Sequence, residues 1–343
     1  MNTAVQKPLK LKGIYNKDKN FFRLLLILAG VFVLCSVLKP DLFLTASNFQ
    51  SMAKQFPEYG LLSIGIGLAL LTGGIDLSVV NIANLSSISA ALFMLSNTTK
   101  DMPDSQVMGV IIVAILIAIG VGLGAGAVNG LLISKVGIPP ILATLGTQQL
   151  YWGIAIVMTE GRSVSGLPSL YSKIFNANIG GALPVALIIF VICALVMGII
   201  LSKTAFGARL YLLGTNSTAS KYAGLKTDSL LVKTYALSGL MAVAAGIIMM
   251  AKQNSAKADY GSAYTLQCVL VAVLGGVSTE GGKGNIQGIV VATIILQFLS
   301  SCLNMYENVS NFYRDIIWGV VLIAALIFNY TVNKRDLLRA QKA

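Results

Sequence analysis

A polar segment interrupts the apolar sequence between residues 59 and 96. It reads Leu71-Thr72-Gly73-Gly74-Ile75-Asp76-Leu77-Ser78, and Asp76 is the acidic residue placed deepest in an apolar region. Paired glycines favour an unwound segment, after which Asp76 or Ser78 can cap the next helix by accepting hydrogen bonds from its free N–H groups. A buried carboxylate can also hold a proton or a cation, or lie beside a polar path or a hinge. The residues alone leave both interpretations open.

Two asparagines continue this polar pattern. At about 100° per residue, Ser78, Asn81 and Asn84 fall within a sector of about 120° on one helix. Amide side chains in an apolar environment require hydrogen-bond partners, which neighbouring helices or a wet cavity can supply. Asn81 and Asn84 are therefore predicted either to join helices or to face a polar cavity.

A second polar stripe follows Pro139 and Pro140. Its members lie within about 100° of one another on a helix, and they are Thr144, Thr147, Gln148 and Tyr151. Hydroxyl, amide and aromatic groups can match the hydroxyls and the ring face of a sugar without any charge. The stripe is predicted either to line a path for such a solute or to pack against a neighbouring helix.

Glycine recurs every fourth residue at Gly122, Gly126 and Gly130. This spacing leaves one helix face without side chains, so that two helices can cross with their backbones close together. We predict helix packing for these glycines, and either packing or a place on the path for the neighbouring Asn129.

The longest polar segment between apolar runs covers residues 202–229. It contains a series of small or helix-capping residues, namely Gly207, Gly214, Asn216, Ala219, Ala223 and Gly224. A short helix with such a face is suited to docking into a groove on a soluble partner. Composition alone also fits an ordinary solvated loop.

Several common kinds of site are missing from the sequence. It has no histidine, and its four cysteines lie singly in apolar runs, which fits neither a disulfide framework nor a metal centre. The glycine-rich stretch 275–285 fails as a phosphate-binding loop, because Val277 replaces the first required glycine and Gly284 stands where a hydroxyl is needed. An intramembrane enzyme is disfavoured, no cofactor is expected on this chain, and any ATP must be hydrolysed by a partner.

The elements that must position these residues are predicted to be membrane-spanning helices. Of the 343 residues, 56% are hydrophobic and only 11% are charged, whereas a soluble domain has about 25% charged residues. A spanning helix needs about 17–25 mostly apolar residues. About ten segments satisfy or approach this requirement: 22–38, 59–74, 77–96, 107–133, 139–158, 183–201, 230–251, 264–276, 285–303 and 314–331. The predicted fold class is an all-α membrane protein.

Basic residues orient these helices within a single domain, 1–343. An even number of spans places both termini on one side, and both tails are rich in lysine and arginine, as cytoplasmic segments generally are. The predicted order is a cytoplasmic tail 1–21, spans one to six in 22–201, a cytoplasmic loop 202–229, spans seven to ten in 230–331, and a cytoplasmic tail 332–343. The net charge of +12 reflects this bias, and no basic helix with interleaved aromatic residues indicates nucleic acid binding.

Taken in order, several segments resemble the permease subunits of bacterial ATP-binding cassette importers of the ribose, galactose and xylose type, in the superfamily of branched-chain amino acid and sugar permeases. The matching segments are Thr72-Gly73-Gly74-Ile75-Asp76-Leu77-Ser78, Asn129-Gly130-Leu131-Leu132-Ile133, Ile141-Leu142-Ala143-Thr144-Leu145-Gly146-Thr147, Thr204-Ala205-Phe206-Gly207, Leu213-Gly214-Thr215-Asn216, Ala223-Gly224-Leu225, Leu274-Gly275-Gly276-Val277-Ser278 and Gly281-Gly282-Lys283-Gly284. Each is weak alone, but the ordered series is specific.

The resemblance implies an inverted-repeat bundle similar to that of vitamin B12 permeases, with the glycine pairs at 73–74 and 275–276 as the only internal hint of the repeat. It also implies a second permease copy or a paralogue, a cytoplasmic ATPase that uses ATP and magnesium, and an extracytoplasmic sugar-binding protein, assembled among the lipids of a bacterial inner membrane. Coupling to the ATPase would fall on the part of the loop 202–229 that runs from Gly207 through Leu225.

An ion-coupled secondary carrier for a small polar solute is the alternative. It would use Asp76 as its proton or sodium site and would need no second protein. Because one buried carboxylate is few for such a pathway, we expect import of a monosaccharide or sugar-like solute driven by a partner ATPase. The predicted translocation path is formed by Asp76, Asn81, Asn84, Asn129, Thr144, Thr147, Gln148 and Tyr151.

Overall fold

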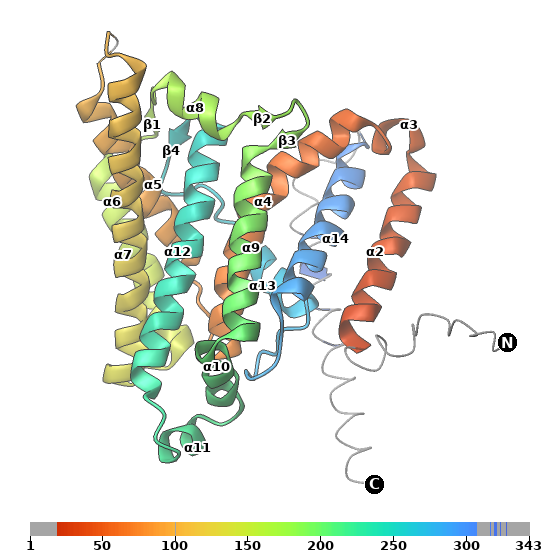
Figure 1. Cartoon of the computed structure of the whole chain (residues 1–343), viewed down its shortest axis with the longest axis vertical. Helices are drawn as coiled ribbons and strands as arrows, with labels where there is room; N and C mark the ends of the chain where they lie inside the picture. Colours follow the sequence, from red (N-terminus) through yellow and green to blue (C-terminus); the bar gives the residue numbers. More distant parts are fainter. Residues whose placement is uncertain are drawn as a thin grey trace, which may run out of the picture.

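The computed structural model describes residues 19–99 and 101–306, together with the single positions Ile316, Gly319, Val320, Ile323 and Ile327. Long helices run up and down between two ends of the molecule (Figure 1). They are α2 (Lys19–Leu38), α4 (Ala46–Leu71), α5 (Val79–Asn97), α6 (Asp104–Leu131), α7 (Pro140–Thr159), α9 (Val185–Lys203), α12 (Thr227–Gln253) and α14 (Ile286–Asn304), and they are joined by the shorter α13 (Tyr264–Leu274). Each coincides with or overlaps one of the first nine predicted spans. Most of the predicted tenth span, 314–331, most of the tail 1–21 and the tail 332–343 lie outside the described residues.

Seven helical segments among the described residues are long and apolar enough to cross a membrane, which confirms a mostly helical, multi-pass protein. They are Phe21–Leu38, Val79–Asn97, Asp104–Val136, Pro140–Thr159, Val185–Lys203, Thr227–Gln253 and Ile286–Asn304. Asp104–Val136 includes a short π-helical turn, η1 (Leu132–Val136), which extends α6.

Two predicted spans differ from their helices. The second was predicted to begin at residue 59, but α4 begins at Ala46, where Thr45 caps it by accepting a hydrogen bond from the Asn48 N–H. Lys54 and Glu58 lower the hydropathy of its first half, so that this half does not resemble a membrane span in sequence. The eighth, α13, has 11 residues and is about 16 Å long at 1.5 Å per residue, which is too short to cross an apolar layer about 30 Å thick.

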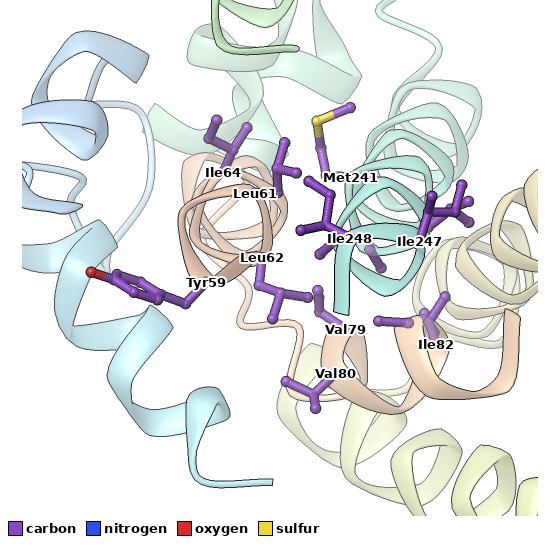
Figure 2. Close-up of a cluster of buried hydrophobic side chains, with 14 of the residues drawn as sticks. Tyr59, Leu61, Leu62, Ile64, Val79, Val80, Ile82, Met241, Ile247 and Ile248 are labelled. Atoms are coloured by element: carbon purple, nitrogen blue, oxygen red, sulfur yellow. The ribbon is translucent and has the colours of Figure 1, made fainter. Parts of the chain in front are cut away.

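The core lies where α4, α5 and α12 meet. From Pro57 to Leu71, every residue of α4 is buried. Figure 2 shows side chains from the three helices in contact, including Leu62 of α4, Val79 of α5 and Ile248 of α12. In contrast, α2, α7 and α9 expose large apolar side chains on their outer faces, as helices that contact lipid do.

The three spaced glycines of α6 face α12. A Cβ atom added at Gly122 would lie 2.9 Å from the Gly239 carbonyl oxygen, and one at Gly130 would lie 2.5 Å from Val232 Cα. At Gly126 the added atom would overlap the Tyr235 carbonyl oxygen. The two backbones therefore approach each other so closely that side chains at these positions are excluded.

Short elements gather at the two ends of the bundle. At the upper end in Figure 1 lie α3 (Pro40–Phe43), α8 (Ser169–Phe175) and two small antiparallel sheets. One sheet pairs β1 (Val164–Ser165) with β4 (Ser255–Ala256), and the other pairs β2 (Asn178–Ile179) with β3 (Leu183–Pro184). At the lower end lie α10 (Ala205–Thr215) and α11 (Ser217–Tyr222).

The two glycine pairs that hinted at an inverted repeat lie at the same end of the molecule. Gly73 ends the turn after α4, and Gly276 lies in the turn after α13, with both in the left-handed region. The Gly282 N–H, in the second turn, donates a hydrogen bond of 3.0 Å to the Leu71 carbonyl oxygen, at the start of the first. Equivalent turns of an inverted repeat lie at opposite ends of a bundle, so these glycines mark a contact between two turns.

Candidate functional site

The unwound segment 72–78 between α4 and α5 places Asp76 inside the bundle. The side chain is fully buried. Its Oδ1 accepts hydrogen bonds from the Ser78 N–H at 3.1 Å and from the Ser78 hydroxyl at 2.7 Å, and its Oδ2 accepts one of 2.9 Å from the Ser238 hydroxyl of α12. No lysine or arginine among the described residues forms an ion pair with it. Neutral donors therefore satisfy the carboxylate and attach the segment to α12.

Asn129 and Thr144 extend this network to α6 and α7. Asn129 donates a hydrogen bond of 2.7 Å to the Ser78 hydroxyl oxygen. Thr144 donates one of 2.9 Å to the Ile75 carbonyl oxygen. Tyr151 donates to the Ala125 carbonyl oxygen at 2.9 Å and lies 3.5 Å from Asn129 Oδ1. Four of the predicted path residues, from the unwound segment, α6 and α7, are thus gathered in one buried cluster.

The remaining predicted path residues lie in two other places. Asn81 and Gln148, both partly buried, meet where α5 contacts α7, and the Asn81 amide donates to the Gln148 carbonyl oxygen at 2.9 Å. Thr147 is buried and donates to the Thr144 carbonyl oxygen within its own helix. Asn84 lies apart and donates to the Ala258 and Tyr260 carbonyl oxygens, so that it fastens the loop after β4 to α5.

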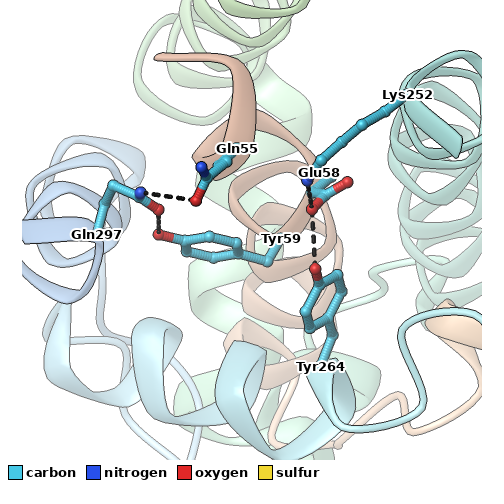
Figure 3. Close-up of polar contacts among 6 residues, drawn as sticks. All are labelled: Gln55, Glu58, Tyr59, Lys252, Tyr264 and Gln297. Atoms are coloured by element: carbon cyan, nitrogen blue, oxygen red, sulfur yellow. Dashed lines mark hydrogen bonds and ion pairs between the residues drawn. The ribbon is translucent and has the colours of Figure 1, made fainter. Parts of the chain in front are cut away.

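A second buried charge, Glu58, was missed by the sequence analysis. Figure 3 shows it between two partners from distant parts of the chain. Lys252, at the end of α12, approaches Glu58 Oε1 to 2.8 Å, and the Tyr264 hydroxyl donates to the same oxygen at 2.8 Å. Glu58 was overlooked because the predicted span began one residue after it. Its position directly before the apolar run was the available signal.

Amide side chains lie beside this ion pair. The Tyr59 hydroxyl donates to Gln297 Oε1 at 2.9 Å, and the Gln297 amide donates to Gln55 Oε1 at 3.4 Å (Figure 3). A cavity of about 220 Å³ opens next to them. Its polar lining comes from Ser51, Lys54, Gln55, Asn176 and Lys252. This end of α4 therefore carries a polar cluster within an otherwise apolar bundle.

The predicted coupling segment forms two short helices at the opposite end. The Thr204 side chain caps α10 by accepting from the Gly207 N–H at 3.4 Å, and Asn216 caps α11 by accepting from the Ala219 N–H at 2.8 Å. These caps satisfy N–H groups that a short helix otherwise leaves free.

The first coupling helix rests on the bundle. Gly207 lies against the Leu201 backbone, and Gly214 lies against the Leu71 carbonyl oxygen and the Gly282 backbone. The Tyr211 hydroxyl donates to the Gly284 carbonyl oxygen at 2.8 Å, and burial raises the pKa of this tyrosine. Consequently α10 joins the turn after α4 to the turn after α13.

The second coupling helix projects from the surface. Ala219, Ala223 and Gly224 are exposed, and Tyr222 is 90% exposed. Gly224 has a φ of +80° and open space around its α-carbon. The half-buried Leu225 returns the chain to the bundle by donating its N–H to the Ser220 carbonyl oxygen. An aromatic side chain surrounded by small residues therefore faces outward at this end.

No group of three metal-binding side chains occurs among the described residues. Their arrangement instead provides buried polar contacts between helices, a polar cluster at one end and a projecting helix at the other.

Known proteins are similar to this chain over most of its length. Residues 48–326 match the family model described as the permease component of branched-chain amino acid transport systems. The ribose import permease protein of Bacillus subtilis is 34% identical, with 94% of this chain and 96% of the relative covered. The D-allose transport system permease protein of Escherichia coli is 29% identical, with 96% of each chain covered.

One further relative and one solved structure are also similar to this chain. The L-arabinose transport system permease protein of Escherichia coli is 30% identical over 90% of both chains. A solved inward-facing structure of a metal-chelate type ABC transporter covers 92% of this chain and 99% of its own, with 16% identity and a TM-score of 0.46. That score is too low to support an argument about the fold.

Proposed function

This chain belongs to the family of permease components of branched-chain amino acid transport systems, and we propose that it forms the path by which an ATP-driven importer passes a monosaccharide or a sugar-like solute across the bacterial inner membrane. Its full-length relatives are permeases for ribose, D-allose and L-arabinose. The chain is a multi-pass membrane protein and a transport subunit, not an enzyme.

The projecting helix α11 is the observation that carries the proposed mechanism. A soluble partner that binds around Tyr222 would push on α10, because α11 follows α10 directly. Through Gly214, α10 is in contact with Leu71, the last residue of α4. Movement of α10 would thus reach the segment 72–78, which holds Asp76 and separates α4 from α5.

We propose three partners that are compatible with this arrangement. A cytoplasmic ATPase, which would bind ATP and magnesium, docks at α10–α11, with contacts from Gly207 through Leu225. An extracytoplasmic sugar-binding protein delivers the solute at the opposite end, and a second permease copy or a paralogue completes the membrane part. The N-terminal side of α2 is cytoplasmic in this proposal, because α2 begins at the end that carries α10 and α11 (Figure 1). The tail 332–343 is assigned to the same side by its basic residues alone.

We assign the path to the region where α5, α6 and α7 approach one another. Asn81 and Gln148 are only partly buried, so they can offer amide groups to sugar hydroxyls. The buried residues Asp76, Asn129, Thr144, Thr147 and Tyr151, and Asn84 nearer the other end, hold the helices that carry those amides. The hydrogen bonds that these residues form within the protein are consistent with this positioning role.

The test is transport by the purified assembly. The tagged chain is isolated from its native membrane in mild detergent, its partners are identified by mass spectrometry, and the complex is reconstituted in liposomes that contain ATP. Labelled ribose, allose and arabinose are then supplied with the co-purified binding protein. We expect ATP-dependent accumulation of at least one monosaccharide or related compound, which ionophores do not abolish.

Two results would contradict parts of this proposal. Uptake by the chain alone, without ATP and sensitive to ionophores, would show an ion-coupled carrier. Purification with an ATPase but without accumulation of any sugar would contradict the solute class and leave the ATP-driven mechanism in place.

A further inference from the structure

A groove of about 550 Å³ runs between α9 and α14. Its walls are apolar and come mainly from Val191, Ala194, Leu195, Ile199, Val290 and Val291. The α9 residues Val191, Leu195 and Ile199 are exposed on the outer surface of a spanning helix, so the groove opens toward the bilayer. Water gains no hydrogen bonds on such walls, and hydrocarbon chains fit them better.

The groove has one polar end, which leads to a second cavity. Lys203, the last residue of α9, borders the groove together with Tyr211 and Asn285. Tyr211 and Asn285 also border a polar cavity of about 350 Å³, which contains Lys283. The two cavities therefore adjoin at the end of the bundle that carries α10.

The charge of this end has one sign. Lys203 and Lys283 are the charged residues in the two linings, and neither lining contains an acidic residue. Both lysines are exposed, and neither forms an ion pair with a described residue. An apolar groove that ends at two unpaired lysines is complementary to a molecule with a hydrocarbon tail and an anionic head.

We propose that this groove binds an anionic phospholipid, with an acyl chain between α9 and α14 and the phosphate near Lys203 and Lys283. Basic pockets between spanning helices at the cytoplasmic side are typical sites for such headgroups. The site depends on the membrane orientation in the proposed function, but it does not depend on the transported solute.

A lipid in this position would contact elements that carry the coupling contacts. The Tyr211 hydroxyl donates to the Gly284 carbonyl oxygen, so the headgroup would lie where α10 meets the turn after α13. Bound lipid would hold these two elements together.

Native mass spectrometry of the intact protein in detergent tests the site. The protein is mixed with equal amounts of phosphatidylglycerol and phosphatidylcholine, and bound lipids are counted after mild activation. We expect about tenfold more phosphatidylglycerol than phosphatidylcholine to remain bound. The variant K203Q/K283Q should lose this preference, whereas K135Q/K233Q, which removes two exposed lysines at the same end outside both linings, should keep it.

A second pair of variants tests the groove itself. Gly198 lines the groove and has open space for a side chain, as does the exposed Gly120 on α6. Gly198→Leu should displace the lipid, whereas Gly120→Leu should not. Equal retention of the two lipids by the unmodified protein would overturn the proposal. An unchanged preference in both K203Q/K283Q and Gly198→Leu would overturn it as well, while sugar transport could still be intact.

Discussion

Asp76 and Ser238 lie 162 positions apart in the sequence, yet the Ser238 hydroxyl donates a hydrogen bond of 2.9 Å to the Asp76 carboxylate. This contact attaches the unwound segment 72–78 to the middle of α12. Because α12 also packs closely against α6 through glycines, a single buried carboxylate connects the break between α4 and α5 to the most densely packed part of the bundle. We therefore regard Asp76 as a residue that positions the helices around the path.

Replacement of Asp76 tests this positioning role. Asp76→Ala leaves the Ser78 and Ser238 donors without their acceptor in a buried site, which costs about 1–3 kcal/mol. We expect a lower unfolding temperature in detergent, with a smaller decrease for Asp76→Asn, because an amide oxygen can still accept. The exposed Asp101 gives a matched control, and its alanine variant should unfold like the unmodified protein. Equal stability of Asp76→Ala and Asp101→Ala would contradict the role.

The close approach of α6 to α12 predicts a sharp contrast between two neighbouring glycines. An added Cβ at Gly126 would overlap the Tyr235 carbonyl oxygen, whereas Gly124 has open space. Gly126→Leu must separate the two helices, and overpacking costs at least about 1–3 kcal/mol. We expect Gly126→Leu to reduce the yield of monodisperse protein several-fold and Gly124→Leu to leave it unchanged. Size-exclusion chromatography measures both, and similar yields would show that the helices separate easily.

The sequence predicted much of the helical bundle, because apolar runs long enough to span a membrane are a strong signal. It failed at α4, whose first half is too polar to resemble a span. There Glu58 pairs with Lys252 and Tyr264, which are about 200 residues away in the sequence. A local sequence pattern cannot predict partners at such a separation. The physical reason is that a polar helix turn is stable in the bundle only with contacts that the fold itself supplies.

The candidate site was predictable to a different extent. The spacing of Thr144, Thr147 and Tyr151 correctly placed these residues on one helix face, and the structure buries that face. Helical periodicity could not tell whether a polar face meets another helix or an open path, because both need the same residue types. For Asp76 the sequence likewise located the unwound segment, but the Ser238 contact required the position of α12.

Gln148 provides a test of the path itself. It is partly buried where α5 meets α7, whereas its neighbour Gln149 is exposed on the outer face of α7. Gln148→Ala should change the rate or sugar selectivity of uptake several-fold while expression stays normal, because the amide would contact the solute. Gln149→Ala should change neither. An equal loss of expression and uptake for Gln148→Ala would indicate packing instead, and uptake per molecule of purified protein separates the two.

The projecting helix α11 leads to the most direct test of coupling. A Cβ atom added at Gly224 would meet no atom within 4 Å, so a large side chain beside this projecting helix would obstruct a docked partner. Gly224→Trp should leave insertion into the membrane intact and should reduce ATP-driven uptake by at least about tenfold, the effect of losing 1.4 kcal/mol of binding free energy.

The matched control lies at the opposite end. Gly181 also has a positive φ and open space, so Gly181→Trp imposes a similar backbone strain away from α10 and α11. The readout is the ATPase that co-purifies, because a change at the Gly181 end could also affect delivery by the sugar-binding protein. If strain alone impaired the protein, both variants would lose the co-purifying ATPase together, whereas docking at α11 predicts that only Gly224→Trp loses it. Retention of the ATPase by Gly224→Trp at the level of Gly181→Trp would place the docking surface elsewhere on the protein.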